Sequence, residues 1–109
     1  MSKSTALAVL FLAAVLEAGG DALVRHALNT SAASSRLMFF ALGAAVLFSY
    51  GYVVNKPAWD FGKLLGIYVV FFFVVAQAIS WAVFGQRPSA GVLTGGAFVL
   101  AGGVIMSIF

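Results

Sequence analysis

Four long apolar stretches, separated by short polar ones, make up nearly the whole chain. We predict helices at about residues 5–28, 37–55, 63–85 and 89–109. Each stretch is close to the ~20 residues that a helix needs to cross ~30 Å of hydrocarbon at 1.5 Å per residue. A membrane β-barrel would show alternating polarity instead, and no such alternation is present. The pattern predicts an all-α integral membrane protein with a single four-helix transmembrane domain over residues 1–109.

Composition supports the membrane prediction. The chain is 63% hydrophobic and 8% charged, whereas a soluble domain carries roughly 25% charged residues. A sequence pI of about 9.7 indicates loop Lys and Arg near lipid headgroups rather than nucleic-acid binding. The absence of cysteine and the single histidine exclude thiolate and multi-histidine metal sites within one chain. No catalytic triad or phosphate-binding loop is present, so we predict no enzyme activity, no metal and no cofactor.

The basic residues divide equally between the two sides of a four-helix membrane domain. Lys3, Lys56 and Lys63 fall on one side, and Arg25, Arg36 and Arg87 on the other. An excess of Lys and Arg on the cytoplasmic side normally sets orientation. Position near helix ends could still select one orientation, but the balance favours dual topology, with copies inserted both ways and paired antiparallel. So small a unit is also expected to need a second copy, and we predict an antiparallel homodimer.

The candidate functional group is Glu17, in the middle of the first apolar stretch. A carboxylate at bilayer depth costs on the order of 3 kcal/mol. A carboxyl group removed from water favours its protonated form, and an approaching cation favours the ionised form. Proton and cation then compete for one charge, so Glu17 is the predicted proton- and substrate-binding residue. Five residues could line a substrate beside Glu17, because they are small, acidic or aromatic. They are Ala13, Ala14, Gly20, Asp21 and Tyr68.

Each of these residues also has a purely structural interpretation. Glu17 could hydrogen-bond a Ser or Tyr of a neighbouring helix and stay protonated. Asp21 is expected to pair with Arg25 at i,i+4 spacing. Tyr68 could contact a cation or only pack. In the first loop, the serines could cap the second helix ahead of Arg36.

Glycines in the last apolar stretch recur on helical faces. Gly95 precedes Gly102 by seven residues, and Gly96 precedes Gly103 by seven. Small residues at such spacing let two helix backbones approach closely in lipid. The stripe predicts a packing seam, either with another helix of the same chain or with a partner copy.

Three parts of the sequence together resemble a known family. Gly20 lies three residues after Glu17, and Arg25 lies eight residues after Glu17. Residues 80–87 read Ser-Trp-Ala-Val-Phe-Gly-Gln-Arg. The last helix contains Gly95 and the run Gly102-Gly103-Val104. This pattern is similar to that of the small multidrug resistance family of the drug/metabolite transporter superfamily. The similarity extends over nearly the whole length of the chain.

The resemblance implies four-helix subunits that form antiparallel homodimers in the bacterial inner or plasma membrane. It implies proton-coupled export of cations through paired membrane glutamates, with Glu17 as the proton and substrate site and Gly95 and Gly102 as dimer contacts. Tyr68 stands where drug exporters of the family have a Trp, and residues 69–72 (VVFF) replace a flexible Ser-Gly-x-Gly. These departures and the longer first loop indicate a divergent member.

The leading hypothesis is therefore a proton-coupled exporter of a cationic or guanidinium-like small molecule. One alternative is an accessory membrane subunit without transport of its own, with Glu17 as a buried polar contact. Another, suggested by relatives in the same superfamily, is a flippase subunit for a lipid-linked headgroup.

Overall fold

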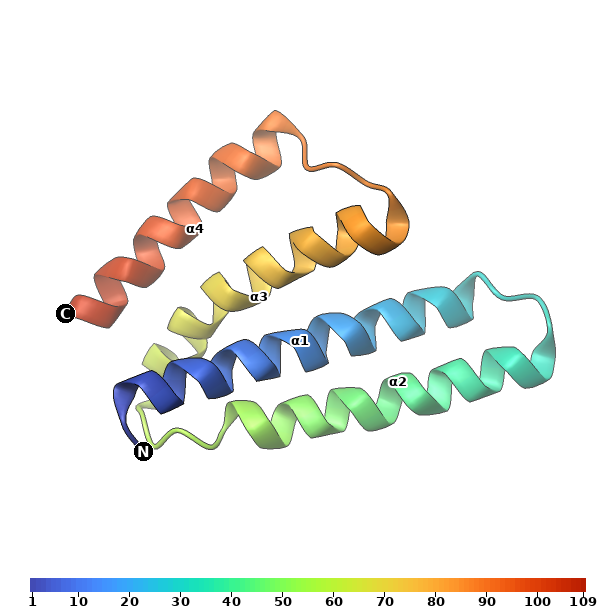
Figure 1. The fold of residues 1–109 in the computed structure, drawn as a ribbon, viewed down its shortest axis with the longest axis horizontal. Coiled ribbons are helices and arrows are strands. Elements are labelled where there is room, and N and C mark those ends of the chain that lie inside the picture. The colour runs from blue at the N-terminus through green and yellow to red at the C-terminus, as the bar shows by residue number, and fades with distance from the viewer.

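The computed structural model describes all 109 residues and is entirely helical outside its loops (Figure 1). The four helices are α1 (Lys3–Leu28), α2 (Ala33–Val54), α3 (Phe61–Phe84) and α4 (Ala90–Ile108). Each is long and apolar enough to cross a membrane. The prediction of an all-α chain with four such helices is confirmed, and the chain has the architecture of a multi-pass membrane protein.

The start of α2 differs from the sequence-based expectation. The helix begins at Ala33, four residues before the predicted position, and its N-cap residue Ala32 makes no side-chain capping bond. Ser34 and Ser35 lie inside the first turn, where the amide of Arg36 donates to the carbonyl of Ala32 (2.9 Å). The prediction that the serines could cap this helix is wrong. The small side chains of Ala33, Ser34 and Ser35 fit a helical first turn, so α2 starts earlier than predicted.

The turn between α3 and α4 follows from local chemistry. Gly85 has φ of 65°, in the left-handed region that glycine adopts without steric cost. The amide of Gly85 donates to the carbonyl of Trp81 (3.1 Å), and the amide of Gln86 donates to the carbonyl of Ser80 (3.0 Å). These bonds satisfy the last carbonyls of α3 and end the helix at a left-handed glycine. Ser89 then starts α4, because its side chain accepts a hydrogen bond from the amide of Val92 (3.2 Å).

The molecule is thin and has a small core. Its extents are 50 × 34 × 19 Å, and a helix with side chains is about 10–12 Å wide, so the body is about two helices thick. α1 and α2 run antiparallel side by side, α3 packs on α1, and α4 packs mainly on α3 (Figure 1). Only 16 of the 109 residues are buried. Most apolar surface therefore faces outward, toward lipid or a partner.

The two glycine pairs of α4 have different surroundings. A Cβ at Gly96 or Gly103 would clash with Phe73 or Val70 of α3. This pair is thus the seam on which α4 packs within the chain. A Cβ at Gly95 or Gly102 would meet no other atom within 4 Å. The face of α4 that carries Gly95 and Gly102 is therefore not covered by another helix of this chain.

Candidate functional site

Glu17 lies near the middle of the membrane-spanning length of α1. Residues 3 and 28 bound this helix, so Glu17 is within about 2 Å of its midpoint at 1.5 Å per residue. Its side chain is half-buried and lies toward α3. There the hydroxyl of Tyr68 donates a hydrogen bond of 2.8 Å to Glu17 Oε1.

Tyr68 is fixed by its own surroundings. It is 4% exposed and belongs to the core that α1 and α3 share. Its ring lies 5.6 Å from that of Tyr50 on α2 and 6.2 Å from that of Phe72, centroid to centroid. This aromatic group positions the phenol at the depth of the Glu17 carboxyl.

This contact is the one that the structural interpretation of Glu17 describes, a hydrogen bond to a Tyr of a neighbouring helix. A phenol that donates to one carboxyl oxygen leaves the second oxygen free. That second oxygen is able to hold a proton or, when ionised, to meet a cation. The bond to Tyr68 is therefore compatible with both the structural and the exchanging role.

Asp21 lies one turn beyond Glu17 and is exposed. It lines a cavity of about 160 Å³ between α1 and α3. The other lining residues are Ala18, Ala22, Arg25, Phe72, Ala76, Ile79, Ser80, Phe84 and Gln86. Small-molecule sites usually enclose about 300–1,000 Å³, so one chain alone offers less space than a typical organic substrate needs.

The predicted ion pair between Asp21 and Arg25 is not formed. The guanidinium of Arg25 instead lies 5.4 Å from the ring centroid of Phe84 on α3, and no Arg25 nitrogen is within 4.0 Å of a carboxylate oxygen. Arg25 is near the end of α1, where a long cationic side chain extends toward the membrane surface and an aromatic face attracts it. Neither Asp21 nor Glu17 therefore has a basic partner within the chain.

The small residues beside Glu17 pack against other helices. Ala13 and Ala14 are completely buried in the core of α1, α2 and α3. A Cβ at Gly20 would lie 2.7 Å from Leu47 Cγ of α2. Their small size lets the helices approach, and none of the three borders the cavity. Of the five residues predicted to line a substrate space, only Asp21 lines it in this chain.

Sequence reasoning missed the α3 wall of this cavity. Phe72, Ala76 and Ile79 share one helical face by their spacing, and all three line the cavity. The spacing was available as a signal. Packing decides which helix this face of α3 meets. No sequence pattern indicated that it lies opposite Asp21 of α1.

Comparisons with known proteins add no assignment. No protein-family model matches the chain, and neither a curated protein nor a solved structure shows significant similarity to it.

Proposed function

We propose that this chain is a subunit of a proton-coupled exporter of the small multidrug resistance type, which moves a cationic or guanidinium-like small molecule. The observation that carries this proposal is the Glu17 carboxyl, near mid-membrane, bonded to Tyr68 and without a basic partner. Asp21 adds a second unneutralised acid one turn away.

The chemistry follows from the cost of charge in a membrane. A carboxylate at this depth loses its net charge by taking a proton or by pairing with a cation. Proton entry from one side then displaces the cation, and cation entry from the other displaces the proton. A guanidinium group fits this site because it donates two parallel hydrogen bonds to a carboxylate and stacks on aromatic faces. The partly exposed rings of Tyr50 and Phe72, which both pack against Tyr68, supply such faces.

A second copy in the opposite orientation would complete the site. A two-fold axis in the membrane plane keeps mid-depth groups at mid-depth, so it would bring two copies of Glu17 to the same level. The thin body, the small cavity beside Asp21 and the open seam at Gly95 and Gly102 support such an antiparallel homodimer. The equal number of basic residues on the two sides supports insertion in both orientations.

The test uses purified protein in liposomes with an imposed pH gradient, and guanidinium and ethidium as two probe cations. We expect cation movement that depends on the proton gradient, and its loss in Glu17→Gln. Ser49→Ala is the control: it changes a polar side chain in another membrane helix, but Ser49 bonds only the carbonyl of Ala45 on its own helix.

Three results would contradict the proposal. Glu17→Gln could move the cations against the gradient as well as the parent chain. The parent could move neither cation and purify with an unrelated membrane protein, which would favour the accessory subunit. It could also transfer labelled phospholipid between leaflets without moving cations, which would favour the flippase subunit.

A further inference from the structure

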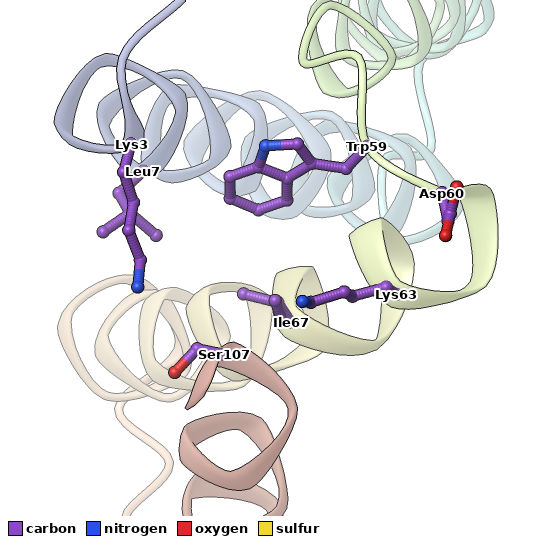
Figure 2. A pocket seen from close by; sticks show the side chains of 7 residues that line it. All are labelled: Lys3, Leu7, Trp59, Asp60, Lys63, Ile67 and Ser107. Carbon is purple, nitrogen blue, oxygen red and sulfur yellow. The ribbon is translucent and has the colours of Figure 1, made fainter. Parts of the chain in front are cut away.

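A second cavity lies at the other end of the α1–α3 interface, beside the loop that precedes α3 (Figure 2). Its volume is about 400 Å³, and it is lined by Lys3, Leu7, Trp59, Asp60, Lys63, Ile67 and Ser107. Lys3 is 14 residues before Glu17, or about 21 Å along α1 at 1.5 Å per residue. This cavity is therefore separate from the site around Glu17.

Two ammonium groups enter this cavity from different helices. Figure 2 shows the side chains of Lys3 and Lys63 directed into the same space, with the Trp59 ring above Lys63 at its border. Neither lysine has a carboxylate oxygen within 4.0 Å. The only acid of the cavity is Asp60, whose carboxylate lies at the far edge, away from Lys3 (Figure 2). Positive charge thus exceeds negative charge in the middle of the cavity.

The positions of these lysines make the excess stronger. Lys3 opens α1, and Lys63 is the third residue of α3. Both are in first turns, where the peptide dipoles place positive charge and cations are unfavourable. Asp60 is the N-cap residue of α3 but makes no side-chain capping bond, so the first amides of α3 have no side-chain acceptor. An anion in this cavity would offset the two ammonium groups, which come from different helices.

The remaining walls indicate the kind of anion. Trp59 belongs to the residue type enriched at headgroup level, and its ring forms one wall. Leu7 and Ile67 form apolar parts of the lining deeper along α1 and α3. A phospholipid headgroup presents this combination of a phosphate and an attached apolar portion, and basic pockets between membrane helices bind such headgroups.

We propose that the cavity of Lys3, Trp59 and Lys63 binds the phosphate group of an anionic phospholipid from the adjacent leaflet. Lysine ammonium groups bind phosphate as point charges, and the volume of about 400 Å³ is within the range of small-molecule sites. This site does not depend on transport at Glu17.

The test measures lipid retention by native mass spectrometry of the purified full chain, with phosphatidylglycerol, phosphatidylcholine and inorganic phosphate offered separately. We expect retained phosphatidylglycerol, with at least a tenfold preference over phosphatidylcholine, and a fall of at least tenfold in Lys3→Gln/Lys63→Gln. Lys56→Gln is the matched control, because the Lys56 ammonium lies 5.1 Å from the Tyr52 ring centroid and outside the cavity lining. Its retention should change less than twofold.

A second measurement locates the lipid. The chain has two tryptophans, so Trp81→Phe leaves Trp59 as the only indole, and a brominated phosphatidylglycerol bound there should quench its fluorescence. Equal retention by the double lysine variant and the parent would overturn the proposal. So would equal retention of phosphatidylcholine, or binding of inorganic phosphate as tight as that of the lipid, which would assign the site to free phosphate.

Discussion

Tyr68 and Glu17, separated by 51 positions in the chain, share a hydrogen bond of 2.8 Å across the α1–α3 interface. The bond gives the mid-membrane carboxyl a donor where water is scarce, and an unsatisfied polar group there would cost several kcal/mol. It also fixes the carboxyl against the aromatic group of Tyr50, Tyr68 and Phe72. One contact thus links a stabilising interaction with the position of the proposed transport group.

The energy of this contact is measurable by a double-mutant cycle of Tyr68→Phe and Glu17→Leu, because leucine, unlike glutamine, offers the phenol no oxygen acceptor. Hydrogen bonds between membrane helices contribute roughly 0.6–2 kcal/mol. We expect a coupling free energy of about 1 kcal/mol in reversible unfolding in mixed micelles. Tyr68→Phe keeps the ring packing and removes only the donor, so it should reduce cation binding while the fold is retained.

Tyr52→Phe is the control for this cycle. Its ring is 67% exposed on α2, and it makes no hydrogen bond to Glu17. Its coupling to Glu17→Leu should be near zero. A coupling as large as that of Tyr68→Phe would show that the cycle reports general loosening of the bundle rather than this bond.

The two glycine faces of α4 predict opposite effects for the same substitution. Gly103→Leu would insert a side chain against Val70 of α3, and overpacking costs about 1–3 kcal/mol. We expect a lower melting temperature. Gly102→Leu enters open space, so the stability of the single chain should be retained while dimerisation falls.

Dimerisation in the Gly102→Leu variant is followed by energy transfer between labelled copies in liposomes, and the melting temperature by circular dichroism. Gly95→Leu should behave in the same way, because Gly95 lies seven residues earlier and is also open. Unchanged energy transfer in both variants would place the contact between copies on another surface.

Orientation is predicted to respond to small changes in loop charge. The parent has three basic residues on each side, and Lys or Arg in short loops sets orientation. Asn29→Lys/Ser31→Lys should place the first loop in the cytoplasm in nearly every copy, and Asn55→Lys/Ala58→Lys should give the opposite orientation.

The chain contains no cysteine, so Phe109→Cys supplies a single thiol for measurement. A membrane-impermeant thiol reagent should label about half of the parent copies in intact cells. Each charge variant should shift labelling toward all or none, in opposite directions. Labelling of the parent on one side only would exclude dual topology.

Several features could be predicted from the sequence. Four apolar stretches of about 20 residues must be helical in lipid, because every backbone polar group needs a partner there. The placement of Glu17 near the middle of a membrane-spanning helix also follows from its position within the first apolar stretch. The start of α2 could not be placed correctly, since Ser34 and Ser35 are compatible both with a cap and with a first helical turn.

The sequence by itself determined which residues share a helical face, because the 3.6-residue period is a property of the single helix. Only the tertiary structure decided how each face is turned against its neighbours. Gly102 and Gly103 differ by one position, yet one is open and the other packs on α3. Arg25 meets Phe84 rather than Asp21, and Tyr68 meets Glu17. The physical reason is that lipid is as apolar as the helix surfaces, so close packing and a few polar contacts select the rotation.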